Sequence, residues 1–303
     1  MQHTLYSSQE IVKIASTQLA NNRQNNLPDM KQLECYEIDS SFAIKAYNEK
    51  YFRPSKLDAI NTVDFNTFIL ENQSNDPEEI TLPKALTDTP SDTIINFFSM
   101  LREANQGATM KVGCGTVGLE ALPYPFSYAF LSSTLKKQLP YTSFLKLFEN
   151  INHINLIKMV YLPSMQTIET SYLFLIEFET IEGECFCYYY GYLEVIFEND
   201  SYLINSLSFD KEDFFCAPYH GWQHNAELTV EIMYHNWCNL ILKQYPTQQE
   251  DYIKRIVIDG SDGNQYMFVF CTLTNGTDIE IGQYKKETND WVKVAMTPSK
   301  CLG

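Results

Sequence analysis

The chain has 303 residues, a formal net charge of −16 and a sequence pI of about 4.7. An acidic chain repels phosphate backbones and anionic lipid surfaces, which argues against nucleic-acid binding and against membrane association. Hydrophobic residues make up 45% and aromatic residues 14% of the chain, enough to fill two or three cores, so wholesale disorder is excluded.

Residues 1–89 are expected to form a helical N-terminal region that ends in a polar linker. Ile11, Ile14 and Leu19 lie at helical spacing, and residues 41–51 and 55–71 are also expected to be helical. The polar, proline-containing residues 72–90 predict a linker or surface loop, and therefore a boundary.

Residues 90–212 are expected to form a domain of helices followed by strands. Thr89-Pro90-Ser91-Asp92 predicts a helix start, because threonine can cap, proline fits the first position and Asp92 can reach back to the cap. Two more helices are expected, at 127–139 and 142–150. Alternating apolar residues predict strands near 153–162, 168–181, 184–198 and 201–209. Asn199-Asp200 predicts a hairpin turn, and Gly191 a bulge.

The helix-then-strands pattern occurs twice, over residues 142–209 and again over 226–297. The second copy predicts one long helix at 226–244 and strands near 252–259, 265–274, 277–285 and 290–297, with hairpin turns at Asp262-Gly263 and Asn275-Gly276. We therefore predict an α+β protein: an N-terminal helical region (1–89), a cone-like curved antiparallel sheet with helices (90–212), and a helix on an antiparallel meander (213–303).

Three helices followed by a bent four-stranded sheet resemble the nuclear transport factor 2-like fold. The segment Phe126–Phe144 is similar to the part of such domains where a short helix turns into the next one. The resemblance covers about residues 90–210, and residues 213–303 look cystatin-like, with a single helix on a meander. Because this cone hosts isomerases, dehydratases, transport adaptors and assembly modules, the resemblance implies a fold rather than one function.

Gly113-Cys-Gly-Thr-Val-Gly118 has the GxGxxG spacing of a dinucleotide site. Such a site needs a strand before it and a helix after it, and we expect Pro123 and Pro125 to prevent that helix. We interpret the segment as a connector.

Cysteine and histidine residues cluster within 23 positions: Cys216, His220, His224, His235 and Cys238. Sulfur and imidazole ligands would suit zinc, although the spacing lacks a CxxC pair. Two alternatives remain open. His220 and Trp222 would pin the connection between the repeats while Cys238 fills a core, or a Cys-His pair would act as a nucleophile. No other cofactor is expected.

The leading functional interpretation is a non-catalytic binding or assembly module that holds a protein partner or small ligand on a curved sheet. The candidate ligand-binding residues are His153, Tyr172, Tyr190, His220 and Trp222. An exposed Tyr/Phe patch would favour this interpretation, and the run Tyr188–Tyr192 could supply one. The alternative is a small-molecule enzyme of the isomerase or hydrolase type, which an enclosed cone pocket with His153 beside a carboxylate would favour. An open sheet face would also allow a homodimer.

Residues Met1 to Arg23 show no signal peptide, and no stretch approaches the about 18 apolar residues needed to span a bilayer. The eight cysteines are too sparse for a small disulfide scaffold and are expected to be reduced core thiols. These features predict a soluble, cytoplasmic protein, or a secreted or cell-surface one if a leader has been removed.

Overall fold

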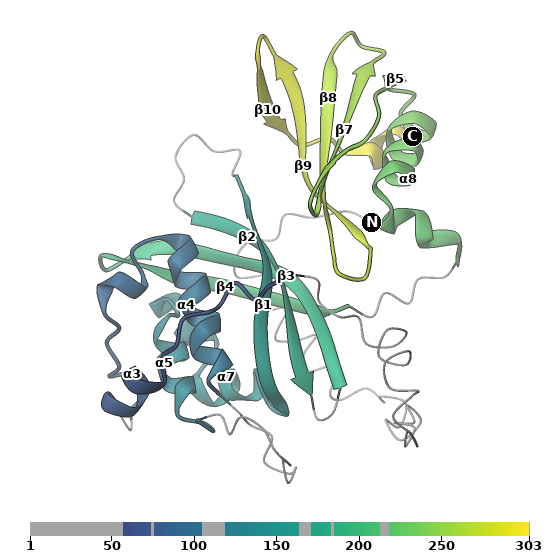
Figure 1. The fold of residues 1–303 in the computed structure, drawn as a ribbon. Coiled ribbons are helices and arrows are strands. Elements are labelled where there is room, and N and C mark those ends of the chain that lie inside the picture. Colours follow the sequence, from purple (N-terminus) through teal and green to yellow (C-terminus); the bar gives the residue numbers. More distant parts are fainter. Residues whose placement is uncertain are drawn as a thin grey trace, which may run out of the picture. The chain divides into compact units, whose positions relative to one another are not determined.

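The computed structural model describes residues 57–73, 76–104, 119–163, 171–182, 185–212 and 218–302, without the side chains of residues 185 and 218–220. The chain divides near residue 212 into two compact units, which are described separately (Figure 1). Both units pair helices with an antiparallel sheet, so the predicted α+β class is confirmed. The helices expected before residue 55 lie outside the described residues.

The larger unit is built on a four-stranded antiparallel meander. Its strands follow one another in the order β1-β2-β3-β4, as the alternating sequence pattern predicts. Their bounds are Ile151–Leu162 (β1), Ser171–Glu182 (β2), Cys185–Glu198 (β3) and Ser201–Lys211 (β4). Asn199 and Asp200 form the β3–β4 turn with φ of 50° and 64°, the left-handed conformation that these two residue types tolerate.

The irregularity between β3 and β4 is not at Gly191, so the predicted bulge there is wrong. Gly191 pairs regularly with Phe209, and the register shifts between Glu194 and Val195, where β4 carries the extra residue Asn205. A Cβ atom on Gly191 would lie 1.8 Å from the Ser208 carbonyl oxygen. Glycine is therefore needed because β4 approaches the backbone closely.

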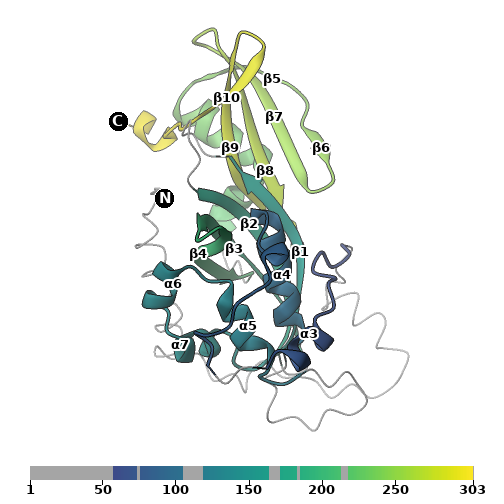
Figure 2. The same cartoon turned by 90° about the vertical axis from the view of Figure 1, so that its left-hand side faces the viewer.

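Six helices of the described residues belong to the larger unit, and they lie on one side of the sheet (Figures 1 and 2). They are α3 (Asn66–Glu71), η2 (Lys84–Leu86), α4 (Pro90–Arg102), α5 (Pro123–Ala129), α6 (Ser133–Gln138) and α7 (Tyr141–Leu147). The start of α4 and its Thr89 cap are as predicted, because the Asp92 amide donates to the Thr89 hydroxyl oxygen at 3.1 Å. The Asp92 carboxylate, expected to reach the cap amide, accepts instead from the Thr89 hydroxyl at 2.7 Å.

The single helix expected at 127–139 is interrupted by a backbone contact with β4. The Ile204 amide donates to the Phe130 carbonyl at 2.9 Å, and the Ser132 amide donates to the Ile204 carbonyl at 2.8 Å. Ser132 then caps a new helix by accepting from the Leu135 amide. Pro123 and Pro125 do not prevent a helix, because both lie in the first turn of α5, where backbone amides lack intrahelical partners.

The core of the larger unit lies between the sheet and these helices. Phe174, Ile176 and Phe178 of β2 point into it, as the alternation predicts. Phe65 and Ile69 belong to the same core, so the described residues before 89 fold with this unit rather than apart from it. On the opposite face of the sheet, Lys158 and Glu177 form an ion pair of 2.6 Å with side chains only 5% and 1% exposed.

The smaller unit packs a short helix on a second antiparallel sheet. Its strands are β5 (Ile241–Gln244), β6 (Gln248–Glu250), β7 (Ile253–Gly260), β8 (Gln265–Thr272), β9 (Asp278–Glu287) and β10 (Asp290–Val294). The four longer segments predicted for this region are confirmed, and Gly263 and Gly276 adopt φ of 80° and 83° in the predicted turns.

The long helix expected at 226–244 is wrong in its second half. Helix α8 (Ala226–Val230) continues into a π-helix, η4 (Glu231–Trp237), and Asn239 then turns the chain with φ of 49°. Residues 241–244 pair with β7 instead. Ala226, Val230 and Tyr234 are buried against the sheet. The flanking helices are η3 (Pro218–His224) and η5 (Pro298–Leu302). Among the described residues, no helix combines the length and apolarity needed to cross a bilayer.

Candidate functional site

The helix side of the larger sheet is filled by aromatic side chains. Phe97 and Phe98 of α4 are almost completely buried, and the Phe98 ring lies 5.3 Å from that of Phe178 on β2. Tyr128, Phe130 and Phe144 are equally buried. The predicted cone pocket is therefore occupied by the protein's own core where it is described.

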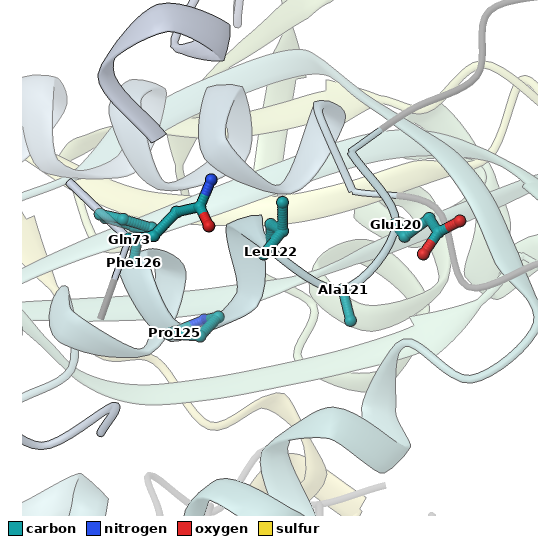
Figure 3. Close-up of a pocket in the computed structure, with 6 residues that line it drawn as sticks. All are labelled: Gln73, Glu120, Ala121, Leu122, Pro125 and Phe126. Carbon is teal, nitrogen blue, oxygen red and sulfur yellow. The ribbon is translucent and has the colours of Figure 1, made fainter. Parts of the chain in front are cut away.

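A small apolar hollow lies between the end of α3 and the start of α5 (Figure 3). It measures about 210 Å³ and is lined by Gln73, Glu120, Ala121, Leu122, Pro125 and Phe126. Ligand pockets for small molecules usually measure roughly 300–1,000 Å³. Neither the size of this hollow nor its few polar groups indicate which class of ligand it could bind.

A second hollow, of about 460 Å³, lies between α6 and the β3–β4 turn. Two cations, Lys136 and Lys137, and two carboxylates, Glu78 and Glu198, lie around it. Burial lowers the pKa of Lys136, while Glu78 and Glu198 act in the opposite direction. Because the positive and negative groups offset each other, this hollow selects neither an anion nor a cation.

Four aromatic side chains form a strip across the sheet, one from each strand, and two of them are exposed while the other two are half-buried. We call this set, Tyr161, Tyr172, Phe197 and Tyr202, the aromatic strip. The ring centroids are 6.3 Å apart for Tyr161–Tyr172, 5.6 Å for Tyr172–Tyr202 and 5.0 Å for Phe197–Tyr202. Phe197 is 58% exposed and Tyr161 38% exposed. Rings in contact that stay open to solvent are typical of recognition surfaces.

The backbone fixes the strip beside the start of α4. The Tyr202 amide donates to the Thr87 carbonyl at 3.0 Å, and the Thr93 hydroxyl donates to the Tyr202 carbonyl at 2.8 Å. The register that pairs Phe197 with Tyr202 sets both rings on the helix side of the sheet. The strip is therefore supported by the rigid part of the unit.

Acidic groups exceed basic ones beside the aromatic strip. Asp200, in the turn between Phe197 and Tyr202, pairs with Lys84 at 2.5 Å. The hydrogen bond to Asp200 raises the pKa of Lys84, and Asp88 adds to this effect. Together with Glu78, Glu198, Lys136 and Lys137 around the same β3–β4 turn, four carboxylates stand against three ammonium groups, which leaves a small local excess of negative charge in a chain whose net charge is −16.

A polar cluster lies at the other end of the same strands. The hydroxyls of Tyr189 and Thr180 donate to one Glu182 oxygen at 2.5 and 3.1 Å, and the Lys211 ammonium lies 3.2 Å from the other. Burial, followed by the Glu182 charge, raises the pKa of the Cys187 thiol. Burial acts to lower the pKa of Lys211, but Glu182 and Cys187 raise it overall. A protonated thiol and a charged amine are poor nucleophiles, so the cluster is not poised for covalent catalysis.

The sequence-predicted residues of the larger unit are not brought together. His153 lies on the face opposite the buried Ile154, so the expectation that it points into the cone is wrong. Its pKa is lowered mainly by burial. Tyr190 pairs with Glu177 on that same outer face. Tyr172 alone joins the aromatic strip. Its three neighbours were missed, because their proximity depends on strand register.

In the smaller unit, Trp222 has a structural role, which is one of the alternatives that the sequence analysis left open for this residue. Its ring packs edge-on against Trp237 with centroids 5.6 Å apart. Its carbonyl accepts from the Thr229 hydroxyl at 3.0 Å. Trp222 thereby attaches η3 to α8. His224 ends η3, and His235 is exposed on η4.

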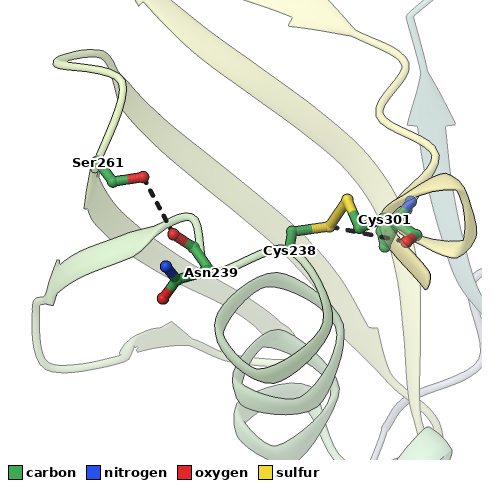
Figure 4. The surroundings of a disulfide bond; sticks show 5 residues. Cys238, Asn239, Ser261 and Cys301 are labelled. Carbon is green, nitrogen blue, oxygen red and sulfur yellow. Dashed lines mark hydrogen bonds between the residues drawn. A yellow bond between two sulfur atoms is a disulfide. The ribbon is translucent and has the colours of Figure 1, made fainter. Parts of the chain in front are cut away.

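Cys238 forms a disulfide with Cys301, which corrects the expectation of reduced thiols at these two positions (Figure 4). The bond joins the end of η4 to η5 and removes the Cys238 thiolate from the predicted zinc ligands. Within the described residues, no group of three or more His, Cys, Asp or Glu side chains is arranged to hold a metal. Cys216 and the His220 side chain lie outside the described set.

No family model matches this chain. Neither a curated protein nor a solved structure is similar enough to count as a match.

Proposed function

We propose that this protein is a non-catalytic binding module whose aromatic strip docks a basic segment of a partner protein. The observation that carries the proposal is the exposure of Phe197 and Tyr161 in a row of touching rings. Elsewhere on the helix side of the sheet, most large aromatic side chains are buried, and Tyr189 and Phe209 are half-buried. Aromatic side chains left in water on a rigid sheet gain free energy when a partner covers them.

The chemistry around the strip favours a basic partner. Ring faces attract ammonium and guanidinium groups, at about 0.5–1 kcal/mol per contact at exposed sites. Asp88 and Asp200 add negative charge at the same end of the sheet, and the net charge of −16 would steer a cationic partner toward the protein.

The order of helices and strands in the larger unit is similar to the nuclear transport factor 2-like architecture, and the helix and meander of the smaller unit to the cystatin-like one. Such folds carry binding modules as well as enzymes. Three features favour a binding module over an isomerase or hydrolase. They are the packed interior, the outward-facing His153 and the protonated Cys187. The Cys238–Cys301 bond supports an oxidising compartment for this module.

The proposal is tested by fluorescence anisotropy with two labelled 12-residue peptides, one with lysine and arginine between aromatic residues and one with glutamate in place of each basic residue. Phe197→Ala is compared with Phe186→Ala, because Phe186 is also an exposed ring of β3, at 50%, on the opposite face. We expect only the basic peptide to bind, and Phe197→Ala to weaken it by about tenfold or more while Phe186→Ala does not. Equal losses in both variants, or no binding of the basic peptide, would overturn the proposal.

A further inference from the structure

Two carboxylates of β9 lie beneath α8 and η4. Only one of them, that of Asp278, has its negative charge balanced by a cation and by hydrogen bonds. Asp278 accepts hydrogen bonds from the Ala226 amide at 2.9 Å, the Lys254 ammonium at 2.9 Å and the Thr272 hydroxyl at 2.6 Å. Its charge is therefore stabilised by a cation and by the start of α8.

Glu280 lies two residues further along β9, opposite the buried Phe270. Among the residues that the structure describes, its buried Oε1 atom has no hydrogen-bond partner, and neither has the hydroxyl of Tyr234 on η4. The two groups are near enough that the charge of Glu280 acts on the Tyr234 hydroxyl. Lys254, a cation of the same face of the sheet, is engaged by Asp278 and Glu227 and does not pair with Glu280 in the described part of the chain.

Glu280 is also connected to the C-terminal segment. The Gln283 side chain hydrogen-bonds to Glu280, and the Gln283 Oε1 atom accepts from the Met296 amide at 2.6 Å. Met296 packs on the core of the smaller unit, and η5 follows it. The Cys238–Cys301 disulfide then returns the chain to the end of η4, the helix that carries Tyr234. Glu280 is therefore linked to η4 in two ways: directly through Tyr234, and indirectly through Gln283, the C-terminal segment and the disulfide.

We propose that Glu280 is a proton-linked latch between β9 and η4, whose ionisation admits water between these two elements. With its proton, Glu280 is a neutral group in a dry core. Without it, a carboxylate is buried beside a tyrosine hydroxyl and one amide, and water must enter to solvate the charge. The Cys238–Cys301 disulfide keeps the end of η4 attached to η5.

The surroundings of Glu280 place this transition near neutral pH. Burial raises the pKa of Glu280 to about 7, against the weaker effect of the Gln283 hydrogen bond. Burial and the Glu280 charge raise the pKa of Tyr234 well above its usual range, so the phenol stays neutral. The other titratable groups described on this side of the sheet are Glu227 of α8, Lys254 of β7, Tyr266 of β8, and Asp278 and Lys285 of β9, while β10 contributes Val292 and Val294 there.

Hydrogen exchange of the full-length oxidised protein, followed by mass spectrometry between pH 6 and 8.5 and corrected for intrinsic rates, tests the latch. In the wild type, we expect protection of η4 to fall about tenfold from pH 6 to pH 8, because the Glu280 carboxyl loses its proton over this range. Glu280→Gln should abolish this pH dependence. Glu287→Gln, an exposed carboxylate on the same strand, should leave it intact.

The latch is refuted if protection in the wild type does not change over this range, or if Glu280→Gln retains the change. The wild-type series needs no variant, so the proposal stays testable even if Glu280→Gln folds poorly. The aromatic strip belongs to the other unit, so neither outcome bears on peptide binding.

Discussion

Replacing Glu280 with glutamine should make the smaller unit more stable at pH 8 and remove most of a pH dependence that the wild type shows. Glutamine is close in shape and can still hydrogen-bond to Gln283, but it has no charge to bury. The pKa of Glu280 is raised from an ordinary 4.5 to about 7, mainly by burial. The folded protein therefore holds a proton that the unfolded chain releases between these two pH values.

The sign follows from the number of protons bound in each state. Where the folded state binds more protons than the unfolded state, stability falls as pH rises. The Glu280 contribution should be intact below about pH 4.5 and lost by about pH 7. At about 1.4 kcal/mol per pH unit, the full loss is about 3 kcal/mol.

All three tryptophans, Trp222, Trp237 and Trp291, belong to the smaller unit, so tryptophan fluorescence during urea unfolding follows that unit. The quantity to measure is the free energy of unfolding of Glu280→Gln minus that of the wild type, at pH 5 and at pH 8. We expect it to increase by about 3 kcal/mol over this interval. A difference that stays the same at both values would refute the reasoning, because a constant offset is a packing effect and not a titration.

Two other perturbations test what holds each unit together. Lys158→Met should cost the larger unit about 3–5 kcal/mol, because it leaves the buried Glu177 carboxylate without its ammonium, whereas Lys158→Met combined with Glu177→Leu should recover most of the loss. Urea unfolding followed by circular dichroism measures both, and equal losses in the single and double variants would contradict the assigned role of the pair. Reducing the Cys238–Cys301 bond, whose partners are 63 residues apart, should destabilise the smaller unit by about 4 kcal/mol in tryptophan-detected unfolding. An unchanged midpoint would show that the bond does not constrain the unfolded chain.

Much of the fold could be predicted from local sequence, because its determinants are local. The alternation of Tyr172, Phe174, Ile176 and Phe178 fixes which face of β2 is buried, and the Thr89–Asp92 pair fixes where α4 begins. Features that depend on distant contacts could not be predicted. The break between α5 and α6 exists because Ile204, more than 70 positions away, bonds to the backbone at Phe130 and Ser132.

The candidate site was harder to predict for the same reason. Tyr161, Phe197 and Tyr202 look like ordinary strand residues until the register brings them beside Tyr172. The aromatic run Tyr188–Tyr192, the source of a patch that the sequence suggests, contains the buried Tyr188 and the half-buried Tyr190. The disulfide partner of Cys238 carried no spacing signal, because Cys301 is close to it only after η5 packs near the end of η4.

The central claim, that the aromatic strip is a docking surface, is tested most directly by photo-crosslinking. A benzoylphenylalanine placed at position 197 is compared with one at position 186, each mixed with the basic peptide and irradiated. The account predicts crosslinked product from position 197 and little from position 186, because only the former lies on the strip. Equal yields from the two positions, or product from position 186 alone, would contradict it.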